Sequence, residues 1–170
     1  MKRPAGELID WPTWEPTVRA TLCFIVKDGR VLLIRKKRGL GAGKINGPGG
    51  KVDPGETALQ SAIRETEEEL CVTARQVRQL GEIFFEFRDG LLLHGAIFRA
   101  DEFDGVATET DEAVPLWTPV NEIPYNEMWA DDRDWLPHLL ANEKFRAVFH
   151  FDGDQLLASR VERLPKDATF

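Results

Sequence analysis

The stretch of residues 50–72, GKVDPGETALQSAIRETEEELCV, constrains this chain more than any other. Its Pro-Gly pair at 54–55 is typical of a loop, and Thr57 followed three residues later by Gln60 is typical of a capping box that begins a helix. One stripe of the helix is predicted to face a core; it comprises Leu59, Ile63, Thr66 and Leu70. The stretch therefore predicts an amphipathic helix after a tight loop.

A second face of this helix is acidic. Glu65, Glu68 and Glu69 are spaced i, i+3, i+4, so their carboxylates repel one another in a helix. A solvated acidic surface would explain such a run. A hard divalent cation, which prefers oxygen ligands, would relieve the repulsion. The helix by itself leaves both interpretations open.

The whole string resembles the Nudix box of hydrolases that act on nucleoside-diphosphate-linked compounds, G-x5-E-x7-R-E-U-x-E-E-x-G-U with U aliphatic. The matching residues are Gly50, Glu56, Arg64, Glu65, Glu68 and Glu69. The chain departs from the pattern at Thr66, where an aliphatic residue is usual, and at Cys71, where Gly is usual. Neither departure removes a carboxylate, so the resemblance favours a metal site.

Composition limits the function classes that fit the chain. A net charge of −7 argues against a non-specific grip on duplex nucleic acid, but not against a small anionic substrate beside a bound metal. The only cysteines, Cys23 and Cys71, do not suggest a disulfide framework. There is no secretory h-region and no membrane-length apolar stretch. We expect a cytoplasmic monomer that binds neither duplex nucleic acid nor membrane.

The rest of the chain reads mostly as strands. With 170 residues we expect an N-terminal arm at 1–17, bearing Pro and Trp, and a single domain at 18–170. Alternation and Asp-Gly turns predict strands at 18–26, 31–35, 81–87, 91–99, around 114–117, 145–151 and 155–161. A second helix is predicted from Asp131 or Asp132. This pattern predicts the α+β class, and the resemblance implies the Nudix fold, an α/β/α sandwich with a mixed β-sheet between helices.

From about residue 21 to 163 the chain is similar to one branch of the Nudix superfamily, the oxidised purine nucleoside triphosphatases of the 8-oxo-dGTP diphosphatase type. The similarity includes KKRGLGAGKINGPGGKV before the helix, GEIFFEF after it, and PYNEMWADDRDWLP and KFRAVFHF further on. It implies hydrolysis of 8-oxo-dGTP, 2-hydroxy-dATP and, as a further candidate, O6-methyl-dGTP to the monophosphate and pyrophosphate. Such an enzyme sanitises the nucleotide pool and prevents DNA damage.

The same resemblance assigns base recognition to Asn46, Asp131 and Asp132, with Trp129 stacking on the purine. Further pocket residues implied by it are Thr21, Lys36, Phe85 and Trp135. A buried carboxylate pair titrates as a unit, so one Asp can donate while its neighbour accepts. The alternatives are that the tryptophans are core residues and that the Asp pair caps a helix.

The phosphate end is expected to use Mg²⁺, with Mn²⁺ as a substitute. The implied ligands are Glu56, Glu65, Glu68, Glu69 and the carbonyl oxygen of Gly50. Glu112 is expected to be a further ligand or the general base, with an ordinary surface glutamate as the alternative. Arg64 is expected to orient the box through ion pairs rather than to touch phosphate.

Several departures from the family pattern predict a wider base pocket; they are Leu40, Ile45, Leu93, Ala113 and Ala130. They leave the preferred base open. Two rival functions also stay open at this point: a Nudix hydrolase of another nucleoside triphosphate or of a dinucleoside polyphosphate, and a nucleotide-binding regulator that has lost catalysis.

Overall fold

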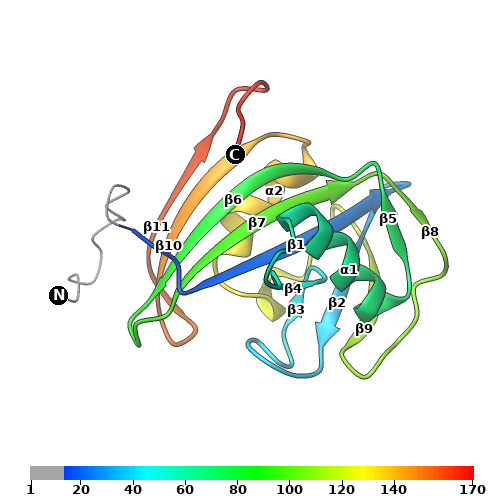
Figure 1. Ribbon diagram of the computed structural model, residues 1–170, viewed down its shortest axis with the longest axis horizontal. Helices are drawn as coiled ribbons and strands as arrows, with labels where there is room; N and C mark the ends of the chain where they lie inside the picture. The colour runs from blue at the N-terminus through cyan, green and yellow to red at the C-terminus, as the bar shows by residue number, and fades with distance from the viewer. Residues whose placement is uncertain (1–13) are drawn as a thin grey trace.

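A curled mixed β-sheet with one helix on each face forms the fold (Figure 1). The computed structural model describes residues 14–170. The strands are β1 (Val18–Lys27), β2 (Arg30–Lys36), β3 (Ile45–Asn46), β4 (Gly49–Lys51), β5 (Thr73–Arg75), β6 (Arg78–Phe87), β7 (Leu92–Ala100), β8 (Glu102–Asp104), β9 (Ala113–Pro119), β10 (Phe145–Asp152) and β11 (Gln155–Arg163). The helices are α1 (Ala58–Leu70), the 3-10 turn η2 (Tyr125–Glu127) and α2 (Asp132–Leu140). The predicted α+β sandwich is confirmed.

The large sheet has the order β11-β10-β6-β7-β1-β2-β3, with β4 paired to β1 and β9 paired to β2. Hairpins join β1 to β2, β6 to β7 and β10 to β11, whereas β1–β7 and β6–β10 are parallel pairs of strands far apart in the sequence. The β1–β2 turn has positive φ at Asp28 (53°) and Gly29 (74°), as the Asp-Gly signal predicts. Parallel pairing brings the second half of the chain against the first.

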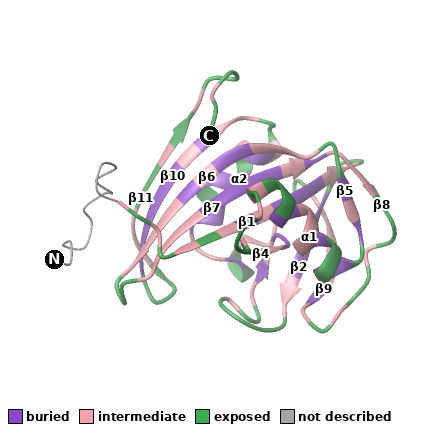
Figure 2. Ribbon diagram, viewed as in Figure 1, coloured by how far each residue is buried: buried purple, intermediate pink, exposed green. Residues whose placement is uncertain are grey.

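Two hydrophobic cores lie on opposite faces of the sheet. In Figure 1, α1 lies in front of the strands and α2 behind them, and Figure 2 shows the buried residues concentrated in the central strands. On the α2 side Trp135, Leu136 and Leu139 pack with Phe145 and Phe149. On the α1 side the core residues include Cys23, Ile25, Ala62, Leu70 and Phe98. Because successive side chains of β1 point to opposite faces of the sheet, this strand contributes residues to both cores.

Helix α1 begins as its sequence predicts. Thr57 accepts from the Gln60 N–H and the Gln60 side chain accepts from the Thr57 N–H, which completes the capping box. The predicted core stripe is only partly right, because Thr66 and Leu70 are buried but Leu59 is 42 % exposed. The buried face turns instead toward small residues, since α1 approaches β1 closely enough for the Ser61 hydroxyl to lie 3.3 Å from that of Thr21.

Cys71 ends α1 in the left-handed conformation, with φ of 62°. Its N–H donates to the carbonyl oxygen of Glu67 at 2.9 Å. A left-handed residue after a helix is most often Gly, which explains why the family pattern has Gly at this position. Cys23 and Cys71 are both free thiols.

Two short strands, β5 and β8, are missing from the strands that the sequence predicts. β5 and β8 form a separate antiparallel pair in which Ala74 lies opposite Phe103. Three-residue strands carry too little alternation to be recognised, and these two form because Ala74 is buried and Phe103 packs on the α1-side core.

The predicted arm falls mostly outside the described residues. Within the described part, Trp14 packs edge-on against Phe84 of β6 with ring centroids 5.1 Å apart. The Thr17 N–H donates to the carbonyl oxygen of Leu92 at 2.8 Å. None of the helices in residues 14–170 is long and apolar enough to cross a membrane.

Gly81 in β6 should not tolerate a side chain. A Cβ at this position would lie 2.3 Å from the ring of Phe145, which is fully buried and stacked on Trp135. We expect Gly81→Ala to lower the free energy of unfolding by about 1–3 kcal/mol, because the ring cannot move aside without repacking the core. Denaturant unfolding measures this change. Gly95 in β7 is the control, since a Cβ there would have no neighbour closer than 3.8 Å, and an equal loss in Gly95→Ala would contradict the steric reason.

Candidate active site

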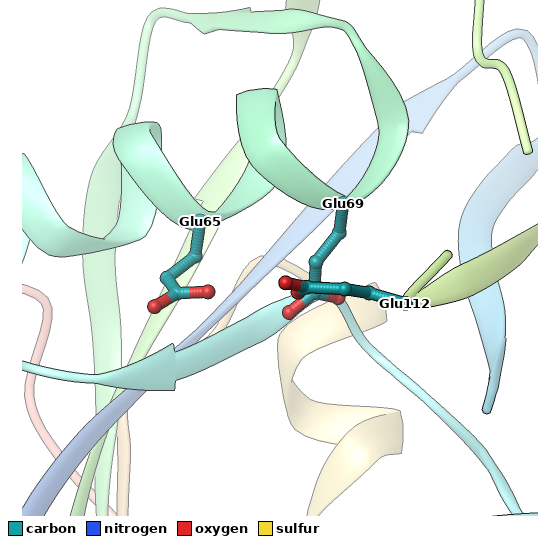
Figure 3. A group of neighbouring side chains, drawn as sticks. All are labelled: Glu65, Glu69 and Glu112. Atoms are coloured by element: carbon teal, nitrogen blue, oxygen red, sulfur yellow. The ribbon is translucent and has the colours of Figure 1, made fainter. Parts of the chain in front are cut away.

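Three carboxylates meet at the end of α1. Glu65 and Glu69 extend from the same face of the helix, and Glu112 reaches them from the loop before β9 (Figure 3). One oxygen from each lies within 4.8 Å of the others. Thr110 fixes this loop, because its hydroxyl donates to the carbonyl oxygen of Glu69 at 2.7 Å and accepts from the N–H of Glu112 at 3.2 Å.

Glu69 is the most strained of these groups electrostatically. Its side chain is 5 % exposed, and its Oε2 has no hydrogen-bond partner among the described residues. Burial, with repulsion from Glu65 as a smaller cause, raises the pKa of Glu69 to about 8. Burial likewise raises the pKa of Glu65. A partnerless buried oxygen beside two further carboxylates fits a hard divalent cation, which needs oxygen ligands and would neutralise the cluster.

Arg64 holds the remaining acidic residues of the box. It donates to both oxygens of Glu56 at 2.7 and 2.8 Å, to Glu65 at 2.9 Å and to Glu68 at 3.1 Å. The hydrogen bonds from Arg64 are the chief reason that the pKa of Glu56 is lowered to about 2. Glu56 and Glu68 are therefore engaged by Arg64 and do not belong to the cluster of Glu65, Glu69 and Glu112. The prediction that Arg64 orients the box agrees with these contacts.

Arg64→Gln should destabilise the protein most at neutral pH. Glu56 and Glu65 are only 14 % and 13 % exposed, so without Arg64 they would repel each other with little solvation. We expect the melting temperature to fall by about 5 °C at pH 7. Because Arg64 depresses the pKa of Glu56 from 4.5 to about 2, its stabilisation is complete above pH 4.5 and is lost as the pH falls toward 2. The difference from wild type should therefore shrink over that range.

Thermal unfolding at several pH values provides the measurement for this variant. Arg75→Gln serves as its control, because the Arg75–Asp104 pair is 60 % and 63 % exposed and should contribute almost nothing. A pH-independent loss in Arg64→Gln would contradict the role given to Glu56.

An apolar pocket opens beside the acidic cluster. Its lining includes every predicted base-site residue, namely Thr21, Lys36, Asn46, Phe85, Trp129, Asp131, Asp132 and Trp135. Gly50 also lines it, and a Cβ on Gly50 would lie 2.5 Å from the carboxyl carbon of Glu65. The absence of a side chain at Gly50 therefore lets the Glu65 carboxylate lie against the backbone that lines the pocket.

Two buried aspartates line this pocket. Asp131 is 2 % exposed and its Oδ2 accepts from the Trp135 indole N–H at 2.8 Å. It makes no side-chain cap hydrogen bond, so the helix-cap alternative is not supported. Asp132 is 3 % exposed, and its Oδ2 has no hydrogen-bond partner among residues 14–170. Burial raises the pKa of Asp131 to about 6 and, with repulsion from Asp131, raises the pKa of Asp132 well above its usual value.

The aromatic residues divide between core and pocket. Trp135 is 1 % exposed and stacks on Phe145, so it is mainly a core residue that orients Asp131. Trp129 is only half-buried, meets Phe87 and Phe151 edge-on, and has the Lys44 ammonium 5.3 Å from its ring centroid. The core alternative therefore applies to Trp135 more than to Trp129.

Some pocket predictions need correction. Leu40 and Leu93 line the pocket, but Ile45, Ala113 and Ala130 are not part of its lining. Ile45 points into the α2-side core and Ala113 into the α1-side core, so neither sets the pocket width directly. The Thr21 hydroxyl pairs with Ser61 of α1.

Lining residues that the sequence analysis did not assign to the pocket are Ala20, Leu22, Ile34, Gly47, Gly49, Phe87, Gly95, Ile97 and Phe151. Alternation from Phe85 could have identified Phe87. Phe151 arrives through the parallel pairing of β10 with β6, which has no local signal.

Comparison with known proteins agrees with this geometry. The family model of the NUDIX domain matches residues 16–139. An oxidized purine nucleoside triphosphate hydrolase of Danio rerio is 46 % identical over 138 residues, which cover 81 % of this chain and 88 % of the relative. The Mus musculus protein of the same name is 42 % identical over 140 residues, with 81 % and 90 % covered.

A solved structure supports the fold independently of these relatives. The Mutator MutT protein from Bacillus halodurans superposes with a TM-score of 0.76 at 28 % identity, covering 85 % of this chain and 97 % of that one. The domain match and the identity to both relatives together show that this chain belongs to the Nudix family.

Proposed function

We propose that this protein hydrolyses oxidised purine nucleoside triphosphates to the monophosphate and pyrophosphate. The observation that carries the proposal is that one pocket is lined both by the buried pair Asp131 and Asp132 and by Gly50, which lies against Glu65 of the acidic cluster. The names of the Danio rerio and Mus musculus relatives support the same substrate class.

The acidic end is suited to divalent metal, and we take Mg²⁺ as the resident ion. Glu65, Glu69 and Glu112 would hold it. The Gly50 carbonyl would be a further ligand, as would Glu68 if it leaves Arg64, to which it is now hydrogen-bonded. A bound Mg²⁺ would neutralise triphosphate charge and lower the pKa of a nucleophilic water. Glu112 serves as a ligand or as the base that takes the proton from that water. Arg64 keeps Glu65 in place through its hydrogen bond, and Glu56 in turn fixes Arg64.

The other end would read the base. Asp131 and Asp132 hold one proton between them because both are buried and repel each other, so the pair presents a donor and an acceptor. Asn46 adds amide donors and an acceptor, and Trp129 offers a ring face for stacking. Lys36 lines the pocket near enough to Glu69 to lower its pKa, so it would bind the triphosphate between the two ends.

Steady-state kinetics on a nucleotide panel with Mg²⁺ tests the proposal. We expect kcat/KM for 8-oxo-dGTP and 2-hydroxy-dATP to exceed those for dGTP and dATP, with pyrophosphate released. A preference for undamaged dGTP over its oxidised form would overturn the sanitising function. Tight binding without pyrophosphate release would instead favour a nucleotide-binding regulator. Action as a cytoplasmic monomer stays a prediction.

A further inference from the structure

Gly95 is a glycine that the protein's own packing does not require. It lies in the interior of β7, where glycine costs strand stability relative to alanine. Its φ lies outside the left-handed region, and a Cβ would have only ordinary contacts at 3.8 Å, with the Ile83 carbonyl oxygen, the Ile97 Cδ1 and the Phe85 ring. Gly81 differs, because the Phe145 ring leaves no room for a Cβ there.

The space left by this glycine belongs to the proposed base pocket. Gly95 lines the pocket and pairs across the sheet with Ala20 of β1, another small lining residue. Phe85 and Ile97 form the other sides of this recess, which we call the Gly95 notch (Ala20, Phe85, Gly95 and Ile97). The side chains that form its walls are apolar. A glycine inside a strand commonly marks a place where a ligand approaches the backbone.

A second observation shows that the pocket is built for a ligand. The Oδ2 of Asp132, which lines the same pocket, is buried and has no hydrogen-bond partner within residues 14–170. A buried polar atom without a partner is costly, so it fits a site in which a bound molecule completes the hydrogen bond. A ligand held there by its polar edge would have its remaining edges against apolar walls.

We propose that the Gly95 notch admits an alkyl group larger than methyl on a purine base, so that bulky alkylated purine nucleoside triphosphates are substrates as well. The inference rests on the proposed function, because it takes this pocket as the base site. The notch can hold the end of such a group because the position of a Cβ on Gly95 is open, with its nearest neighbours 3.8 Å away. Apolar walls favour an alkyl group over a charged one.

The test uses dGTP alkylated at N2 or at O6 with methyl, ethyl or isopropyl groups, alongside 8-oxo-dGTP. For the alkylation position that faces the notch, we expect wild-type kcat/KM to fall less than about tenfold from methyl to isopropyl. Gly95→Val should lower the ratio of isopropyl substrate to 8-oxo-dGTP by about 10- to 200-fold, since it fills the space of the substituent. Gly95→Ala should give an intermediate ratio.

A binding measurement separates recognition from catalysis. Calorimetry with the alkylated monophosphates in EDTA should give binding affinities in the same order as the kcat/KM values. Gly95→Val should bind the isopropyl compound more weakly than wild type does. Ala20→Val narrows the notch from β1 and should repeat the effect if Gly95→Val does not fold. Gly95→Ala should melt at or above the wild-type temperature, whereas Gly81→Ala should melt below it.

The outcomes distinguish this inference from the function on which it rests. If kcat/KM declined equally from methyl to isopropyl in wild type and in both notch variants, while 8-oxo-dGTP was still hydrolysed, the role of the notch would be refuted. The proposed function would then stand. Absence of turnover on every oxidised purine triphosphate in wild type would overturn the proposed function itself. A lower melting temperature in Gly95→Ala would show that packing requires the glycine, and would also overturn the inference.

Discussion

Glu69→Gln is expected to abolish turnover and, in the absence of divalent ions, to stabilise the protein. Glutamine keeps the shape of the side chain but removes a charge that the proposed metal site needs, so kcat should fall by about 10²–10³-fold or more. The wild-type carboxyl is buried, with a pKa of about 8 against an ordinary value of 4.5. Between these two values the native protein binds more protons than the unfolded chain, so wild-type stability falls as the pH rises.

The glutamine variant does not lose stability as the pH rises. In wild type this loss of stability corresponds to about 3 kcal/mol at pH 7. We expect its melting temperature in EDTA to exceed that of wild type by about 5–10 °C, with the difference opening above pH 4.5 and levelling off above pH 8. Adding Mg²⁺ should stabilise wild type but not the variant.

Glu67→Gln is the matched control, because Glu67 lies exposed on the same helix and its carboxylate accepts from the Thr73 hydroxyl. It should leave turnover and melting temperature nearly unchanged. Wild-type rates in Glu69→Gln, or equal stabilisation in both variants, would refute the assignment of Glu69.

Asp132→Asn should change which oxidised purine is hydrolysed. Asparagine is always neutral, so the pair can no longer exchange its proton between the two residues. One hydrogen-bonding pattern is then fixed, and we expect the ratio of kcat/KM for 8-oxo-dGTP and 2-hydroxy-dATP to shift by about 10²-fold. Steady-state kinetics on the two substrates measures it. Asp134→Asn, on the exposed side of α2, should preserve the ratio.

The same variant makes a stability prediction with a defined sign. The pKa of Asp132 is raised above 3.8 by burial and by Asp131, so wild-type stability falls as the pH rises above that value. Asp132→Asn removes this loss and should melt higher than wild type at pH 7. A lower melting temperature together with an unchanged substrate ratio would contradict both the electrostatic strain and the base-reading role.

Local patterns predicted those parts of the fold that depend on nearby residues. The capping box of α1 needs only Thr57 and Gln60, and the alternation of β6 needs only its own side chains. The exposure of Leu59 could not be predicted in this way, because the rotation of α1 is set by its close contact with β1. The β5–β8 pair depends on two segments that are individually too short to show a period.

The site was predictable in kind but not in arrangement. Periodicity placed Glu65 and Glu69 on one face, whereas Glu112 entered only through the family resemblance, since no spacing rule connects it to α1. The sequence could not show that Arg64 would pair with Glu56 and Glu68, because several carboxylates lay within its reach along the chain. The importance of Gly95 depends on strand pairing and on the space above it.

The two cores on opposite faces of the sheet have a consequence for how this protein can evolve. The proposed base-reading residues are backed by the α2-side core, whereas Glu69 lies on α1, whose Leu70 belongs to the opposite core. Substitutions more than about 7–10 Å apart without shared partners have additive effects. Mutations that alter the recognised base should thus combine additively with mutations around the carboxylates, and substrate preference can diverge while the reaction itself is retained.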